Sequence, residues 1–413
     1  MGGPDSGTSI FSQARALLGY RNVRVLAFTS AMSGTYLSIL NTILQPFVVT
    51  ELGFTVAVLG TLVSIGNRPL GLASSLVQPF AGALSDSFGR RRLMILGSIV
   101  AISSMASFLV AAVTRSILPL SLGFVFLGLS LLGNPATQAV IAETVEMDRR
   151  KLGVAFSLIF FFQALPGAVF PFSVSLLVSA IMFDGIFALA VLLESANLIV
   201  LFTQLRETRP SHTPVAAEAP PSPISIRRVF SIPPGFLKIF TPFAMDAFSY
   251  GLAGAIIYGM WSDYFHFNEG DIGLIVGVLL FSVVATQYPA TKFLLRFGTR
   301  TTLAFSEFLT VLVMAGWLLS SSPLVLAGLS AVFGLSVSAW VPANSALLMS
   351  AAPESQRGSI SGKLAAVRGL VFVPAPIIGG LLFSAYGYYV PVFLGMVGES
   401  FTVVAILRLI PKS

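Results

Sequence analysis

The sequence predicts an all-α polytopic membrane protein with twelve transmembrane helices, arranged as two pseudo-symmetric six-helix bundles. Its 413 residues are 55% hydrophobic and 10% charged, with a mean hydropathy of +0.89, whereas ordinary soluble domains contain about 25% charged residues. Apolar runs of roughly 20 residues, each long enough to cross a bilayer core of about 30 Å as a helix, recur along the chain. One polar connector divides these runs into two groups. The runs leave no room for a catalytic domain, so an enzyme is not expected.

The predicted spans and the connector define the domains. We expect spans at 25–47, 57–82, 93–113, 118–142, 152–181 and 186–205, and again at 236–262, 272–295, 302–320, 324–350, 359–385 and 389–409. The connector has Pro at seven of its 30 positions and no apolar periodicity, which is typical of an extended polar linker. The predicted domains are an N-terminal six-helix bundle at 1–205, a cytoplasmic linker at 206–235 and a C-terminal six-helix bundle at 236–413.

Charged residues between the spans predict the orientation. Basic residues gather on one side of the membrane, and the other side carries Arg115 with the acids Glu51, Asp184, Asp263, Glu269 and Asp271. Because cytoplasmic loops carry the excess of Lys and Arg, both termini are expected in the cytoplasm of a multi-pass cell-membrane protein. The net charge of +7 is therefore an orientation signal and does not indicate a nucleic-acid partner. We expect the lipid bilayer and a small-molecule substrate as partners of a monomer.

The sequence indicates no cofactor, metal or nucleotide site. It contains no Cys, and its two His residues, His212 and His266, lie far apart in polar segments. The first 22 residues have no apolar segment followed by a small-residue cleavage site, so no cleaved signal peptide is expected. The segment Gly358-Ser-Ile-Ser-Gly362-Lys363-Leu364 lacks the spacing of a phosphate-binding loop. An ATP-driven pump is therefore not supported.

The two groups of spans resemble each other in sequence. Ala31-Met32-Ser33, Phe54 and Gly60 recur 213 residues later as Ala244-Met245-Asp246, Phe267 and Gly273; Pro135-Ala136 and Arg150 recur 207 residues later as Pro342-Ala343 and Arg357; and Glu194-Ser195 recurs 205 residues later as Glu399-Ser400. A duplicated six-helix unit is typical of secondary transporters, whose substrates bind near the midplane where the repeats meet.

The loop between the second and third spans carries a specific motif, Gly82-Ala-Leu-Ser-Asp86-Ser-Phe-Gly89-Arg90-Arg91-Arg92. It resembles the G-x-L-x-D-x-x-G-R-R/K motif of the major facilitator superfamily at every specified position. The number and division of the spans extend this resemblance over essentially the whole chain. The resemblance implies the two-bundle fold of that family and transport by alternating access. The corresponding loop of the second half has Leu295 in place of the Asp, so a second motif of this kind is not expected.

The resemblance also implies that the motif forms a cytoplasmic gate. Asp86 ends a predicted helix, where the helix dipole disfavours an anion, so it needs a positive partner. That partner is either Arg90 or, as in the family, the N-terminal end of the eleventh span, near Ser359. Arg90 is expected to pair with Glu143 or Glu146. Alternatively, the basic residues only anchor the loop in the cytoplasm. The gate candidates are Gly82, Asp86, Gly89, Arg90, Arg91 and Glu143.

Three ionisable residues are predicted near the bilayer midplane. Arg68, Asp246 and Arg368 lie about 10 residues from the nearer ends of their spans, which at 1.5 Å per residue places them roughly 15 Å deep. A charge at the bilayer centre costs about 2.5–3.5 kcal/mol on insertion scales, so a retained charge is a candidate functional group.

The family fold implies that Arg68 and Arg368 converge on a central cavity from opposite halves. Two guanidinium groups suit a carboxylate or phosphate substrate. Asp246 is a candidate proton carrier, because desolvation favours the neutral form of a carboxyl group. In the alternative interpretation, Asp246 and Arg368 are a permanent ion pair and Arg68 bonds to carbonyls freed by Pro69.

Other polar and aromatic side chains are candidates for the cavity lining, although core packing explains each of them equally well. They are Tyr36, Asn41, Gln45, Gln138, Tyr250, Tyr258, Trp340 and Asn344. Glu194 and Glu399 lie in peripheral spans and are expected to bond to hydroxyl groups in a symmetric structural role. Glu307, Lys292 and Lys363 are expected near the cytoplasmic ends, where long side chains reach the interface or assist the gate.

These observations predict a secondary transporter of a small organic or inorganic anion, coupled to protons. A proton-driven exporter of drug-like lipophilic compounds is the first alternative, favoured by the aromatic candidates. A membrane receptor or lipid-handling protein that does not transport is an alternative of another class, which the intact gate motif disfavours.

Overall fold

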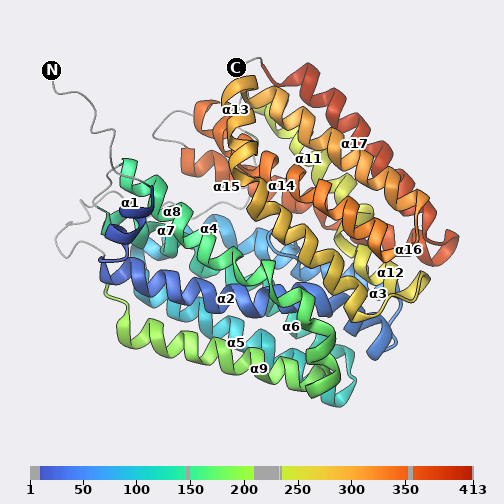
Figure 1. Cartoon of the computed structure of the whole chain (residues 1–413), viewed down its shortest axis with the longest axis horizontal. Coiled ribbons are helices and arrows are strands. Elements are labelled where there is room, and N and C mark those ends of the chain that lie inside the picture. The colour runs from blue at the N-terminus through green and yellow to red at the C-terminus, as the bar shows by residue number, and fades with distance from the viewer. Residues whose placement is uncertain (1–9, 146–148, 209–231, 233–234, 352–356, 412–413) are drawn as a thin grey trace.

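The computed structural model describes residues 10–145, 149–208, 232, 235–351 and 357–411. Within this part of the chain all regular structure is helical, which confirms the predicted all-α membrane fold. The helices form two groups that lie side by side, α2–α9 (the first half) and α11–α17 (the second half) (Figure 1). Glu146, His212 and most of the linker lie outside the described residues, so the domain boundaries stay predictions.

In the first half, most of the expected helices are divided into shorter consecutive elements. Its elements are α1 (Ile10–Leu17), α2 (Arg21–Pro46), η1 (Phe47–Glu51), α3 (Val56–Gly66), α4 (Leu72–Phe88), α5 (Arg90–Thr114), α6 (Ile117–Leu129), η2 (Ser130–Gly133), α7 (Asn134–Thr144), α8 (Arg149–Ala164), η3 (Pro166–Ala168), η4 (Phe170–Ser173) and α9 (Val174–Gln204). The short helix α1, which precedes the first span, was not predicted.

The second half repeats this order with fewer interruptions. Its elements are α11 (Leu237–Ala253), η5 (Gly254–Ile256), α12 (Ile257–Tyr264), α13 (Glu269–Leu319), α14 (Pro323–Ala351), α15 (Arg357–Phe372), α16 (Pro374–Tyr386) and α17 (Tyr389–Leu409).

The number of membrane spans agrees with the prediction. Nine helical segments of the described chain are long and apolar enough to cross a bilayer. Two of them, Val154–Gln204 and Glu269–Leu319, each contain two helices, because the backbone leaves the helical region at Met182 (φ 56°) and Gly298 (φ 78°). Helices α3 and α4 supply one further span in two pieces. The arrangement therefore fits twelve spans.

The break between α3 and α4 departs from the continuous helix expected at 57–82. Pro69 lacks an N–H donor and cannot continue a helical hydrogen-bond ladder. The Ser74 hydroxyl donates to the carbonyl oxygens of Asn67 (3.0 Å) and Pro69 (2.9 Å), and the Gln78 amide also donates to that of Pro69 (2.9 Å). These side chains satisfy carbonyl groups that the break frees, as a membrane interior requires. Arg68 lies within the break.

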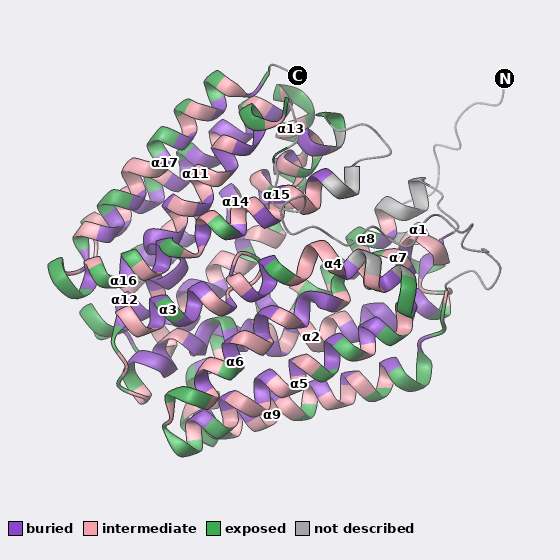
Figure 2. Cartoon of the chain, turned by 180° about the vertical axis from the view of Figure 1, so that it is seen from behind, coloured by how far each residue is buried: buried purple, intermediate pink, exposed green. Residues whose placement is uncertain are grey.

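The outer surface of the helix groups is apolar. Exposed residues lie along the outward faces of the helices, whereas buried residues face the interior (Figure 2). Large apolar side chains are among the most exposed, such as Leu319 (87%), Leu176 and Val113. A continuous apolar exterior of this kind is typical of contact with lipid.

Two equivalent glycine contacts join the halves. A Cβ atom on Gly60 of α3 would lie 2.1 Å from the carbonyl oxygen of Pro376 in α16, and one on Gly273 of α13 would lie 2.3 Å from that of Pro171 in η4. Only glycine permits such close approach. Gly60 and Gly273 occupy repeated positions, so the contacts support the internal repeat. Helices α3, α12 and α16 gather at the end of the molecule away from α1 and the C-terminus (Figure 1).

Candidate functional site

A cavity of about 510 Å³ lies between the two halves. The first half lines it with residues of α2 and of the α3–α4 break, and the second half with residues of α11 to α15. Its polar, charged and aromatic lining consists of Asn41, Gln45, Asn67, Arg68, Asp246, Tyr250, Tyr258, Glu307, Thr310, Phe333, Ser336, Trp340 and Arg368. We call this space the central cavity.

The structure places Arg68 and Arg368 on this cavity from opposite halves. Arg368 of α15 is held by three neighbours: Nη2 donates to Asp246 Oδ2 at 2.7 Å, Nε donates to the carbonyl oxygen of Phe243 at 3.3 Å, and the guanidinium group lies 4.7 Å from the centroid of the Trp340 ring. The ion pair is largely buried, with side-chain exposures of 14% for Arg368 and 15% for Asp246. The ion pair of the alternative interpretation is therefore present in this state.

Arg68 differs from Arg368 in its electrostatic partners. Within the described part of the chain no carboxylate lies within ion-pair distance of Arg68. Its side chain also borders a second, smaller pocket inside the first half, next to Tyr36. Arg68 is thus a half-buried cation with an open charge, meaning that no carboxylate of the described chain pairs with it directly. Glu194 and Tyr36 interact with it from the second pocket, and it borders both spaces.

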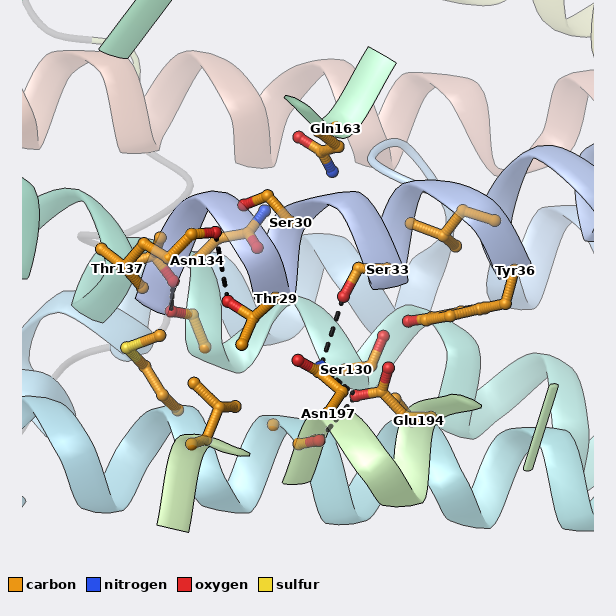
Figure 3. Close-up of a pocket in the computed structure, with 18 of the residues that line it drawn as sticks. Thr29, Ser30, Ser33, Tyr36, Ser130, Asn134, Thr137, Gln163, Glu194 and Asn197 are labelled. Carbon is orange, nitrogen blue, oxygen red and sulfur yellow. Dashed lines mark hydrogen bonds between the residues drawn. The ribbon is translucent and has the colours of Figure 1, made fainter. Parts of the chain in front are cut away.

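The second pocket has a volume of about 160 Å³ and a polar lining (Figure 3). Glu194 Oε1 accepts hydrogen bonds from the Ser98 hydroxyl (2.6 Å) and the Asn197 amide (3.0 Å), and Asn197 also donates to the Ser33 hydroxyl (3.3 Å). Tyr36 lines this pocket and not the central cavity, contrary to its predicted place. Glu194 makes the hydroxyl contact expected of a structural acid.

Three carboxyl groups meet in the second half. One carboxyl oxygen each of Asp246, Glu307 and Glu399 lies within 4.8 Å of the other two. Glu307 and Glu399 are buried, and neither oxygen of Glu399 has a hydrogen-bond donor among the described residues. The expectation that Glu307 lies near the cytoplasmic end was wrong: it is nine residues beyond the turn at Gly298 and borders the central cavity. We call these three groups the carboxyl cluster.

The other predicted lining residues divide into two sets. Asn41, Tyr250 and Trp340 line the central cavity, whereas Gln138 and Asn344 do not. Gln138 is exposed on α7, beyond the 3₁₀ turn η2, whose tighter winding changes which face of the helix follows. Asn344 lies one turn beyond Trp340 on α14. Asn67 also lines the central cavity. It was not predicted from the sequence, although its neighbour Arg68 was a predicted lining residue.

The predicted gate contains a network around Arg90. Arg90 Nη2 pairs with Glu143 Oε1 at 3.1 Å, and Nη1 donates to the Ser85 hydroxyl at 3.1 Å. The Glu207 carboxylate accepts the backbone N–H groups of Arg90 and Arg91 at 3.1 Å each, which places an anion at the N-terminal end of α5, where the helix dipole favours it.

The remaining gate candidates differ in how much the structure describes. Gly89 has the positive φ (96°) expected of its tight turn. The Arg91 guanidinium donates to the Phe202 carbonyl oxygen and lies 5.4 Å from the centroid of the Phe202 ring. The Asp86 side chain, the surroundings of Gly82 and the side chain of Ser359 lie outside the described residues, so the proposed contact of Asp86 stays a prediction.

Comparisons with known proteins agree with this architecture. A sequence profile of the Major Facilitator Superfamily matches residues 26–260 and 239–413. No curated protein matches the chain significantly in sequence.

Solved structures with a similar fold have low sequence identity. A mutant of the nucleoside transporter NupG has a TM-score of 0.74 at 13% identity, covering 94% of this chain and 100% of that one. A D-xylose–proton symporter has a TM-score of 0.68 at 12% identity, covering 95% and 98% of the two chains. The human organic anion transporter MFSD10 has a TM-score of 0.59 at 17% identity, covering 94% and 99%. With the profile match over nearly the whole length, these findings show that the chain belongs to the Major Facilitator Superfamily of membrane transporters.

Proposed function

We propose that this transporter moves a small organic or inorganic anion, and that the anion binds in the central cavity between Arg68 and Arg368. The observation that carries the proposal is the open charge of Arg68. Arg68 is half-buried at the cavity wall, so its guanidinium group is accessible to an anion in the cavity and is not already occupied by a carboxylate. Arg68 faces the same cavity as Arg368, so one bound anion can reach donors from both halves. Guanidinium groups bind carboxylate and phosphate groups through paired N–H donors.

Asp246 links the anion to protons in this proposal. It now neutralises Arg368 at 2.7 Å. When an anion takes over the Arg368 guanidinium, Asp246 remains as a buried carboxylate without a partner, and it becomes neutral by taking a proton. Anion and proton therefore bind together. Two structurally similar proteins support the two elements of this idea, since one is an organic anion transporter and the other is a D-xylose–proton symporter.

Alternating access supplies the transport step. The glycine contacts of Gly60 with Pro376 and of Gly273 with Pro171 join the two halves, and in this proposal they close one end of the cavity. Rocking of one half against the other would open this end and close the end that carries the Arg90 network. In this proposal the Arg90 network and both termini lie in the cytoplasm of a cell-membrane protein, because the basic loops gather on that side.

Export of a lipophilic compound is a second candidate function. The aromatic rings of Tyr250, Tyr258, Phe333 and Trp340 line the central cavity and favour a substrate with apolar or aromatic surface. A transporter of this class would not need the open charge of Arg68, which is why we place it second.

Reconstituted liposomes test the proposal. We expect labelled phosphate or a labelled small carboxylate to exchange across the membrane, and Arg68→Gln and Arg368→Gln to reduce that exchange by at least tenfold. The control is Arg115→Gln, which removes an exposed arginine paired with Glu51 and leaves the exchange unchanged. Anion exchange that survives both cavity substitutions would overturn the proposal. Uptake of a lipophilic dye with no anion exchange would favour the second candidate.

A further inference from the structure

The carboxyl cluster contains more acid than its surroundings neutralise. Asp246 comes from α11, Glu307 from α13 and Glu399 from α17, and their oxygens lie within 4.8 Å of one another. The groups that face them are the Arg368 guanidinium of α15, the Tyr250 hydroxyl of α11 and the Trp340 indole N–H of α14, which lies beside Glu307; α14 contains no ionisable residue. One cation thus faces three carboxyl groups.

Arg368 cannot neutralise all three groups. It donates to Asp246 at 2.7 Å, so that carboxylate is paired. Glu307 is 3% exposed and has one oxygen without a donor, and Glu399 is 0% exposed and has two. Like charges at this separation in a buried site strongly disfavour joint ionisation. The geometry therefore disfavours the ionisation of Glu307 and Glu399 together in this state, so the pair holds at least one proton.

The internal repeat shows that these acids are a departure from a simpler arrangement. Glu194 and Glu399 occupy repeated positions, and Ser98 and Glu307 each lie nine residues after a positive-φ glycine, Gly89 or Gly298. In the first half the acid accepts a hydrogen bond from that serine at 2.6 Å. In the second half the corresponding position is Glu307, so a carboxyl group replaces the serine hydroxyl that donates in the first half. Glu399 consequently needs a proton of its own or one shared with Glu307.

We propose that Glu307 and Glu399 form a two-carboxyl proton-binding site that exchanges protons with the central cavity through Glu307. Glu307 borders the cavity, whereas Glu399 lies behind it and does not line it. Glu307 is therefore the point of exchange with cavity water, and Glu399 holds the second proton out of contact with water.

The site also supplies a proton to Asp246. This step rests on the proposed anion function. When an anion takes over Arg368, the O–H bond of Glu307 breaks and an O–H bond forms on Asp246. A proton from cavity water then restores Glu307. The net result is uptake of one proton for each anion bound, with Glu399 unchanged in charge.

Infrared spectroscopy of the purified protein tests the site without any transported anion. A protonated carboxyl group has a C=O stretching band that shifts on transfer into D₂O, and a carboxylate lacks this band. We expect the spectrum at neutral pH to lose or shift such a band in Glu307→Gln and in Glu399→Gln, and to lose both in the double variant. Glu51→Gln is the control, because Glu51 lies at the surface, paired with Arg115 at 2.7 Å, and far from the carboxyl cluster in sequence and structure.

The outcomes separate this inference from the proposed function. Protonated-carboxyl bands that are the same in the wild type and in both variants would overturn the proton site, whatever the transport results. Loss of the wild-type bands on addition of Mn²⁺ would also overturn it, since the three carboxyl groups would then be a divalent-cation site. If the bands are lost as expected but liposomes exchange neither phosphate nor carboxylate, the proton site is retained and the proposed anion transport is rejected.

Discussion

The two halves use the same helix positions for different chemistry. In each half, the first, third and sixth spans bring three polar side chains together. In the first half these are Ser33, Ser98 and Glu194, and in the second half Asp246, Glu307 and Glu399. The first half therefore holds one acid among hydrogen-bond donors, and the second half holds three acids beside Arg368.

This difference determines whether a bound anion changes the charge balance of the acids in each half. The acid of the first half has two hydrogen-bond donors on Oε1, Ser98 and Asn197, while its Oε2 has no partner among the described residues. The acids of the second half depend on one guanidinium group that faces the cavity, so a bound anion changes their charge balance. The duplicated scaffold is thus symmetric in its packing and asymmetric in its electrostatics. Four predictions test this conclusion, two of them by matched substitutions in both halves.

The largest effect is expected from Arg368→Gln. It removes the cation of the carboxyl cluster and leaves Asp246 as a buried carboxylate, which should lower the free energy of unfolding by about 3–5 kcal/mol. Thermal unfolding in detergent measures the loss. The double variant Arg368→Gln/Asp246→Asn should recover most of it, because it removes both charges. Equal losses in the single and double variants would show that the ion pair is not the cause.

The glycine contacts should respond equally in the two halves. Gly60→Ala and Gly273→Ala each place a Cβ atom against a backbone carbonyl oxygen of the opposite half, at a cost of about 1–3 kcal/mol. Exchange in liposomes and thermal unfolding should both fall by similar amounts. Gly328→Ala is the matched control, since no atom lies within 4 Å of its added Cβ. An effect at one glycine alone would contradict the symmetry of the contacts.

Substitutions at the third span should affect the two halves differently. Ser98→Ala removes a donor to Glu194 and should cost about 1–3 kcal/mol. Under the proposed proton site, Glu307→Gln replaces a neutral acid by an amide of the same shape and should cost less than about 1 kcal/mol. Unfolding midpoints at neutral pH measure both. A larger loss for Glu307→Gln than for Ser98→Ala would mean that Glu307 is ionised in the folded protein.

The smallest effect is expected at the Arg90 network. Glu143→Gln removes a partly exposed partner of Arg90, with side-chain exposures of 13% for Arg90 and 23% for Glu143, and should cost no more than about 1 kcal/mol. Since the chain contains no natural Cys, an introduced cysteine in the central cavity reports access from that side. Its labelling rate should rise in the variant. An unchanged rate would leave the network as an anchor of the loop.

Hydropathy and one loop motif were sufficient to predict the fold class and the family. Both signals are local in sequence, because a membrane span must be apolar over its own length and the motif occupies one loop. The repeat was visible at Gly60 and Gly273, where close backbone contact demands glycine in both halves. The placement of Arg68 and Arg368 on one cavity followed from the family fold, whereas their role stays a prediction.

The details that the sequence did not predict depend on tertiary structure. The segment around Arg68 was expected to be part of a continuous helix, although Pro69 marks a break. The break is possible in the membrane because Ser74 and Gln78, farther along the chain, donate hydrogen bonds to the carbonyl group of Pro69. Glu307 was placed near the interface because its span was expected to begin at residue 302, whereas the helix resumes directly after the turn at Gly298. Its proximity to Glu399 is a contact between distant segments.

The unwound turn between α3 and α4 has a mechanical consequence. The two helices contact different parts of the second half, α3 packing on α16 and α4 on α15, and both also pack on α6. A joint between rods bends more easily than a continuous helix, so one end of this span can swing while the other end keeps its neighbour. Arg68 is located at the joint, and its guanidinium group would be carried along as the joint flexes. Spin labels on α3 and α4 should report a change in their mutual angle during turnover, and a constant angle would show that the span moves as one piece.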